Sequence, residues 1–141
     1  MTATPAHSGM PEHFGIRITG ADDNHGAQVR VSQAESLVGS ARLFLFDTLE
    51  RLWRPLIATG EVTMEARALV RLAASHAVIS AVQAVDLLYI GAGASALYTN
   101  CPLERAFRDV HAITQHIGVN PRVMETTGRV LFGLEPDTPL L

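Results

Sequence analysis

An apolar run between residues 73 and 92 limits the fold of this 141-residue chain more than any other feature. Its residues are mostly alanine and larger aliphatic side chains, and it contains no glycine or proline before Gly91. Upstream, Thr63 suits an N-cap and Glu65 suits the positive end of a helix dipole, so one helix is predicted from about Thr63 to Tyr89 or beyond. Because the run is apolar nearly all round, other helices or another subunit are expected to surround it.

The same run has almost the length of a membrane span, but polar residues interrupt it. Asp86 lies well inside it, and a carboxylate near the middle of a span costs several kcal/mol. We therefore predict a buried helix and no membrane partner. The carboxylate of Asp86 is expected to pair with an Arg or His of a neighbouring helix, because a buried charge needs a partner.

Charge and cysteine content exclude several classes of protein. The net charge is -3, with 11 basic residues among 14 acidic ones, so a basic face for nucleic acid is not expected. The lone Cys101 cannot form an internal disulfide, which favours a reducing compartment. The first residues lack a basic start followed by an apolar run, as a secretory signal would have. The predicted location is the cytoplasm.

Local sequence signals divide the chain into an irregular segment and a helical domain. Residues 1–28 are rich in glycine, proline and histidine and are predicted to be irregular, whereas 29–141 are predicted to form one helical domain. A capping box at Ser32–Glu35 predicts the start of a first helix, which should end near Pro55 and Gly60.

Two further helices are predicted to begin at prolines. Pro102 and Pro121 suit the first helical position, and Gly133 should end the last helix. Apolar residues at helical spacing follow both prolines: Leu103, Phe107, Val110 and Ile113 after the first, and Val123, Val130, Leu131 and Phe132 after the second. The expected architecture is an all-α four-helix up-and-down bundle.

The segment Pro102–His116, PLERAFRDVHAITQH, carries most of the candidate chemistry. His111 and His116 lie about 140° apart around a helix, so they cannot grip one metal ion. Glu104 and Arg108 have the spacing of an ordinary intrahelical ion pair. No metal site is predicted here, nor from His7, His13 and His25, which lack a fixed spacing on a regular element. His116 falls where the helix should end, so its imidazole could either project into a cleft or stabilise the helix C-terminus.

The longer segment GAGASALYTNCPLERAFRDVHAITQHIGVNP resembles the C-terminal domain of acyl-CoA dehydrogenase-like flavoproteins. It is most similar to the two-component flavin-dependent monooxygenases, such as dibenzothiophene monooxygenase, and the likeness extends more weakly back to Val29. In that family a histidine eight residues after an arginine faces the reactive edge of the flavin. Counted from Arg108, this position is His116, where a peroxide of reduced flavin would be hydrogen-bonded and protonated. The resemblance therefore makes His116 the candidate catalytic residue and implies a structural role for His111.

The resemblance also implies a cofactor and partners. By this resemblance, Gly93, Ser95 and Arg108 are expected to bind the cofactor, which is FMN or FAD. Thr114, Gln115 and His116 stand where many dehydrogenases carry a catalytic glutamate, which favours oxygen insertion, although Glu35 or Glu50 remain alternative bases.

The family's N-terminal and middle domains have no counterpart in these residues. The expected partners are further copies in a dimer or tetramer, or a chain that supplies the flavin and substrate domains, together with a flavin reductase. The chain is not expected to be active alone. The alternative is a non-catalytic helical module, a truncated remnant that binds itself or a partner.

Overall fold

The computed structural model of the protein describes residues 25–138, and this part of the chain is helical without strands. It contains four α-helices: α1 (His25–Thr59), α2 (Met64–Ala92), α3 (Pro102–Ile113) and α4 (Arg122–Leu131). Two short 3₁₀ helices join the last three: η3 (Gly93–Leu97) and η4 (Ile117–Val119). The prediction of an all-α fold with four helices is confirmed.

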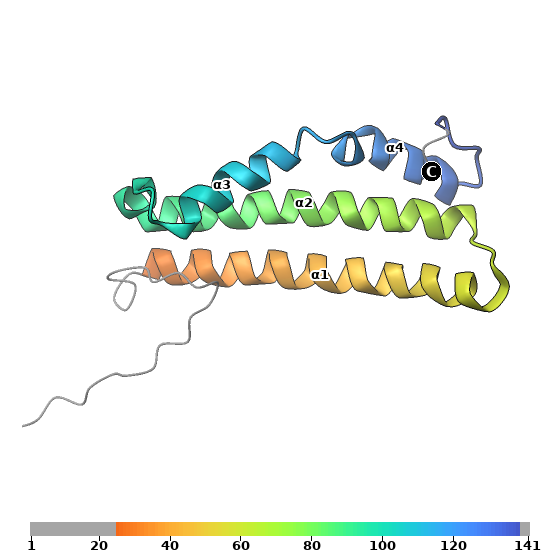
Figure 1. Cartoon of the computed structure of the whole chain (residues 1–141), viewed down its shortest axis with the longest axis horizontal. Helices are drawn as coiled ribbons and strands as arrows, with labels where there is room; N and C mark the ends of the chain where they lie inside the picture. Colours follow the sequence, from red (N-terminus) through yellow and green to blue (C-terminus); the bar gives the residue numbers. More distant parts are fainter. Residues whose placement is uncertain (1–24, 139–141) are drawn as a thin grey trace, which may run out of the picture.

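Helix α2 is the central element. Helix α1 packs antiparallel along one side of it, and α3 and α4 follow one another along another side (Figure 1). The chain therefore runs in one direction in α1, returns in α2, and reverses again through α3, η4 and α4. This central position accounts for part of the apolar surface of α2.

Helix α1 begins earlier than the sequence predicted. Its first residue is His25, so the expected start at Ser32 is wrong, and residues 25–28 are helical although they were assigned to the irregular segment. The hydroxyl of Ser32 does not cap the helix but donates to the carbonyl of Gln28 at 3.1 Å, one turn back. Nothing between His25 and Ser32 forbids helix, since Gly26 only weakens it. The remainder of the segment predicted to be irregular, 1–24, lies outside the described residues.

Helix α1 continues through its proline and ends just before a glycine. Pro55 lies inside the helix and is exposed, and it does not end the helix although it has no N–H to donate to the carbonyl of Arg51. The helix stops at Thr59, and Gly60 has a φ of +75°, which a residue with a side chain rarely adopts. The predicted end near Gly60 is confirmed.

Small side chains form the contact surface of α1. Its buried residues recur every seven positions: Ala27, Ala34, Ala41 and Thr48. Helix α2 also buries mainly small residues: Ala68, Ala73, Ser75, Ser80, Ala84 and Leu88. Because side-chain size sets the distance between helix axes, these residues let the two long helices approach closely.

The N-terminus of α2 follows the prediction. Thr63 is the N-cap, and its hydroxyl oxygen accepts a hydrogen bond from the backbone N–H of Ala66 at 3.2 Å. Glu65 lies in the first turn, where the helix dipole favours an acid. The side chain of Thr63 thus satisfies one of the N–H groups that a helix start leaves without an intrahelical partner.

Replacing Thr63 by alanine is expected to reduce the free energy of unfolding by about 1 kcal/mol, because the N-cap hydrogen bond is lost. Urea denaturation followed by circular dichroism measures this change. Ser40→Ala is the matched control, since Ser40 is an exposed hydroxyl residue within α1 and bonds only the carbonyl of Leu37. An equal loss in both variants would show that Thr63 contributes no capping.

By length and composition, residues 64–97 include a helix that could cross a membrane. The central helix of a bundle passes the same test, so this property is weak evidence. In this chain α2 contacts α1, α3 and α4, and Asp86 forms a polar contact with α3. Only 17% of its apolar window is buried within the chain, however, so much of this surface is left for contacts outside the described residues.

The best-buried cluster lies where α1, α2 and the start of α3 meet. It contains Ala34, Ala84, Leu88 and Leu103, and Cys101 packs against it. Pro102 opens α3 as predicted, and the side chain of Leu103 is only 1% exposed. Burying a leucine side chain contributes roughly 1.5–3 kcal/mol, so Leu103 is a main anchor of α3 on the two long helices.

Helix α4 begins at Arg122, with Pro121 one residue ahead of it. The side chain of Asn120 accepts from the backbone N–H of Arg122 at 3.0 Å and caps this end. The predicted apolar face of α4 is partly wrong, because Leu131 and Phe132 are exposed. Buried threonines replace them: the hydroxyl of Thr127 donates to the carbonyl of Ala68 at 3.3 Å and thereby tolerates burial against α2.

Candidate functional site

His116 lies at the junction of α3 and η4, outside both helices. Helix α3 ends at Ile113, and the backbone N–H of His116 donates to the carbonyl of that residue at 2.9 Å. The backbone of His116 is then extended, with φ −73° and ψ 137°, and the residue forms the N-cap of η4. Its side chain is therefore presented at a break between helices and is exposed in the chain.

The imidazole of His116 has a defined tautomer. Its Nδ1 accepts a hydrogen bond from the backbone N–H of Gly118 at 3.1 Å, and an accepting nitrogen carries no proton. The neutral ring must therefore hold its proton on Nε2. A Cβ atom added at Gly118 would lie 3.1 Å from Nδ1, so glycine at that position lets the backbone approach the ring. The result is an exposed N–H donor at Nε2.

His111 lies in a contact between helices, where it pairs with Asp86 of α2. Its Nε2 lies 3.0 Å from Oδ1 of Asp86 on α2, and both side chains are 40% exposed. The ring of Phe107 packs on the imidazole at a centroid distance of 4.3 Å, and Tyr89 packs on Phe107 at 4.6 Å. The prediction that Asp86 pairs with a residue of a neighbouring helix is confirmed.

Arg108 forms the intrahelical pair that its spacing predicted. Its Nε lies 2.9 Å from Oε1 of Glu104, and the side chain of Arg108 is 69% exposed. Arg105 and Asp109 form a second such pair at 3.4 Å. Exposed pairs four residues apart contribute only a few tenths of a kcal/mol, so about 0.3–0.5 kcal/mol is expected from each. The guanidinium of Arg108 faces solvent in the described chain.

Gly93 and Ser95 lie at the far end of α2. Gly93 is the C-cap of that helix with a φ of +55°, and both residues belong to η3 and are exposed. Helix α3, which has 12 residues and is therefore about 18 Å long, runs from this end towards His116 (Figure 1). The structure does not bring Gly93, Ser95, Arg108 and His116 together in one pocket. They are spread along the side of α2 that carries α3.

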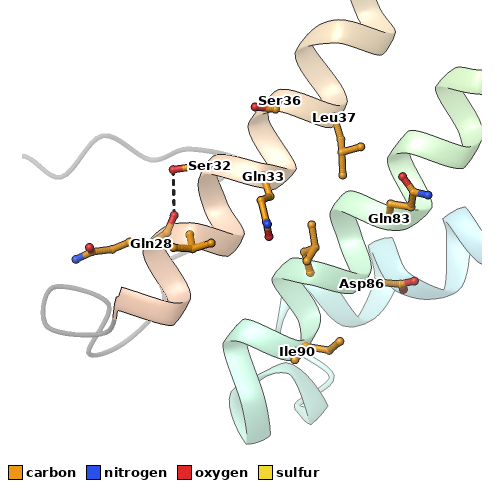
Figure 2. A pocket seen from close by; sticks show the side chains of 10 residues that line it. Gln28, Ser32, Gln33, Ser36, Leu37, Gln83, Asp86 and Ile90 are labelled. Carbon is orange, nitrogen blue, oxygen red and sulfur yellow. Dashed lines mark hydrogen bonds between the residues drawn. The ribbon is translucent and has the colours of Figure 1, made fainter.

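Two hollows lie near these residues, and sequence reasoning missed both. An open groove of about 900 Å³ separates the first turns of α1 from the last turns of α2. In Figure 2, Gln33 and Leu37 extend from α1 towards α2, whereas Asp86 is directed towards the adjacent α3. Polar side chains recurring along the first turns of α1, such as Ser32, Gln33 and Ser36, were the available signal, but their spacing matched no motif.

The second hollow, of about 130 Å³, adjoins η4 and the start of α4. Arg71, Ile117 and Asn120 line it together with the C-terminal segment. Here Thr126 donates to Asp137 at 2.7 Å, and this hydrogen bond holds the pKa of Asp137 below its usual value. The segment after α4 is thus folded back against that helix, and Asp137 lines the same hollow as Ile117.

Within residues 25–138, no three His, Cys, Asp or Glu side chains gather as metal ligands would. His7 and His13, which were considered as ligands together with His25, lie outside the described residues. The site geometry therefore consists of one oriented imidazole, exposed apolar neighbours at Ile113 and Ile117, and polar residues distributed along α3.

Comparison with known proteins gives these features a context. A family model described as "Acyl-CoA dehydrogenase, C-terminal domain" matches residues 12–121. The indole-3-acetate monooxygenase of Pseudomonas putida is 32% identical over 86% of this chain and 32% of that protein. The flavin-dependent monooxygenase oxygenase subunit HsaA of Mycobacterium tuberculosis is 30% identical over 93% of this chain and 35% of that protein.

Solved structures agree with the sequence matches. The HsaA monooxygenase of M. tuberculosis superposes with a TM-score of 0.79 at 32% identity, over 92% of this chain and 34% of that one. The 3-HSA hydroxylase of Rhodococcus sp. RHA1 gives the same TM-score at 30% identity, over 86% of this chain and 32% of that one. The chain spans about a third of the length of the curated relatives it matches.

Proposed function

Because this chain belongs to the acyl-CoA dehydrogenase C-terminal domain family, as the C-terminal domain of its flavin-dependent monooxygenase-type members, we propose that it supplies one helical wall of a flavin site. The proposed activity is aromatic hydroxylation in a two-component system, with the remaining walls coming from N-terminal and middle domains. The chain covers only about a third of its relatives, so this activity belongs to an assembly that contains those domains.

The observation that carries the proposal is the orientation of His116. Its Nδ1 is held by the N–H of Gly118, and its Nε2–H is directed away from that bond on an exposed ring. Ile113 and Ile117, which are both exposed, flank it. An apolar surface with a single N–H donor fits one face and one polar edge of a flavin ring. It does not fit the phosphate or the ribityl chain, which need additional groups.

When bound, reduced flavin supplies the electrons that activate oxygen. His116 then has a limited role that its tautomer defines: Nε2 donates a hydrogen bond to oxygen at the reactive edge of the flavin. Outright proton transfer from a neutral imidazole would leave an anionic ring. Such transfer therefore requires prior protonation of Nδ1, which would break the hydrogen bond from Gly118. His116 is better suited to hold a proton in place than to release it.

Gly93, Ser95 and Arg108 are assigned to the cofactor side in this proposal. The exposure of Ser95 and of the Arg108 guanidinium leaves their polar atoms accessible to a flavin chain or phosphate. The flavin is FMN or FAD, and the relatives include an FADH(2)-dependent resorcinol hydroxylase oxygenase component. A separate flavin reductase would supply the reduced cofactor, because several relatives are named as oxygenase components or subunits.

Assembly with other chains is also part of the proposal. The partners are further copies in a dimer or tetramer, or a chain that carries the flavin and substrate domains. The incomplete cover of α2 supports such contacts. A cytoplasmic location fits the single unpaired Cys101, which is half-buried against the core.

The alternative function is a non-catalytic module that associates through its helices. One observation favours it: a row of exposed apolar side chains follows α1 at helical spacing, comprising Leu43, Phe46, Trp53 and Ile57. Such a row has the character of an interface.

Reconstitution tests the proposal. The purified chain is mixed with an HsaA-type relative from which the matching C-terminal third has been removed, and reduced flavin is added. We expect a complex that co-elutes in size-exclusion chromatography and retains flavin absorbance. The variant His116→Asn should still assemble, since an asparagine can also cap η4. Self-association without any retention of flavin would refute the proposal and support the alternative.

A further inference from the structure

We propose that Asp86 and His111 are positioning residues that fix the orientation of the His116 imidazole. This inference rests on the proposed function, because it assigns the pair to the support of the Nε2 donor. Neither residue reaches the proposed flavin site itself. Their action is through the last turn of α3, which leads directly into His116.

The pair is unlike the other ion pairs of the described chain. The remaining four each join residues four apart on one exposed helix face, as in Arg105 with Asp109. Asp86 and His111 are 25 positions apart and join α2 to α3. The packing of Phe107 on the His111 ring, with Tyr89 behind it, orients the imidazole towards Asp86.

Short-range hydrogen bonds tie the last turn of α3 to the residues that follow it. The carbonyl of His111 accepts from the Thr114 hydroxyl at 2.6 Å, and Thr114 in turn accepts from the side-chain amide of Gln115 at 3.1 Å. The backbone N–H of His116 donates to the carbonyl of Ile113, in the same last turn. These bonds make the end of α3 and the residues before η4 one locally ordered unit.

His116 thus lies between two attachments to α2. Before it, Asp86 holds the last turn of α3 through His111. After it, η4 contacts α2 directly. With only the second attachment left, the end of α3 can move relative to η4, and the close approach of Gly118 to Nδ1 is no longer enforced.

A purely stabilising role predicts a different result. Both side chains of the pair are partly open to solvent, and exposed pairs contribute little to global stability. Loss of the pair should therefore act near His116 and leave the rest of the chain folded. A probe of the His116 ring itself separates these two roles.

The test is ¹⁵N NMR of the histidine rings in the full 141-residue chain, with the His116 signals identified by their loss in His116→Asn. In Asp86→Ala, the ratio of the Nε2–H to the Nδ1–H tautomer of His116 is expected to fall about three- to tenfold, the equivalent of one net hydrogen bond. Asp86→Asn should largely restore the ratio, because its amide oxygen can still accept from His111. Asp109→Ala, which removes a carboxylate of α3 that pairs with Arg105, should leave the ratio unchanged.

An unchanged His116 ratio in both Asp86→Ala and His111→Leu would overturn the inference. His111→Leu serves as the second variant should Asp86→Ala fold poorly, since leucine is a good helix former and cannot hydrogen-bond Asp86. The proposed function is judged separately, by the share of consumed reduced flavin that appears as hydrogen peroxide in the reconstituted complex. A shifted tautomer ratio without increased peroxide release would support the positioning of His116 and refute its catalytic role.

Discussion

Replacing His116 by alanine is expected to lower hydroxylation by a reconstituted complex about 10²- to 10³-fold, while flavin is still retained. This is the usual cost of removing one preorganised donor from a site where charge develops on oxygen. His116→Asn should be less impaired, because its side-chain amide offers a donor and can cap η4. The measurement is the rate of product formation at saturating reduced flavin, together with the yield of hydrogen peroxide.

His25→Asn is the matched control for this experiment, because His25 is an exposed histidine in the first turn of α1, which packs on a different side of α2 from α3 (Figure 1). Its hydroxylation rate should equal that of the unmodified chain. Retention of full activity in His116→Ala would contradict the assignment of this residue. A general loss in both variants would point to assembly instead, which size-exclusion chromatography of the same samples detects.

Truncating Leu103 to alanine is expected to reduce the free energy of unfolding by about 2–5 kcal/mol. The side chain is 1% exposed and anchors α3 to the cluster that contains Ala34, Ala84 and Leu88. Alanine would leave a cavity between three helices, and small neighbours cannot fill it. The total stability of a domain is about 5–15 kcal/mol, so this is a large fraction.

Urea denaturation measures this change in the free energy of unfolding, provided that the m-value of the variant equals that of the unmodified chain. Leu43→Ala is the control, since Leu43 lies on α1 and is 74% exposed. Its change should stay within about 0.5 kcal/mol. A similarly small loss for Leu103→Ala would mean that α3 contributes little to folding of the domain.

Features that depend on local chemistry were predictable from the sequence. The cap at Thr63, the break at Gly60 and the start of α3 at Pro102 each follow from one or two residues and their intrinsic backbone preferences. The start of α1 was not predictable in the same way. A capping box at Ser32 is a valid local signal for the start of a helix. Because α1 already begins at His25, however, the backbone N–H groups after Ser32 are satisfied within the helix and need no cap.

For features that depend on contacts between helices, the sequence predicted the type of contact but not the residues that make it. The carboxylate of Asp86 needed a partner, but which histidine or arginine it meets depends on how α3 lies on α2. The face of α4 shows the same limit, because apolar spacing pointed to Leu131 and Phe132. Thr127 is buried instead, since a threonine hydroxyl can bond a carbonyl of the facing helix.

The resemblance to the flavoprotein family made His116 the catalytic candidate, whereas helical spacing alone left its role open. The structure adds which nitrogen of its ring can donate. That distinction depends on Gly118, two residues further on, whose missing side chain allows the contact.

The seven-residue repeat of small side chains on α1 has a consequence for how the two long helices are aligned. Ala27, Ala34 and Ala41 are equivalent in size and chemistry, so a slide of α1 along α2 by two turns would place one alanine where another had been. The repeat of small residues thus determines how closely the two helices pack, but not where α1 lies along α2. The unique alignment must come from what does not repeat, above all the short connection from Gly60 to Thr63, whose length limits how far one helix can slide along the other.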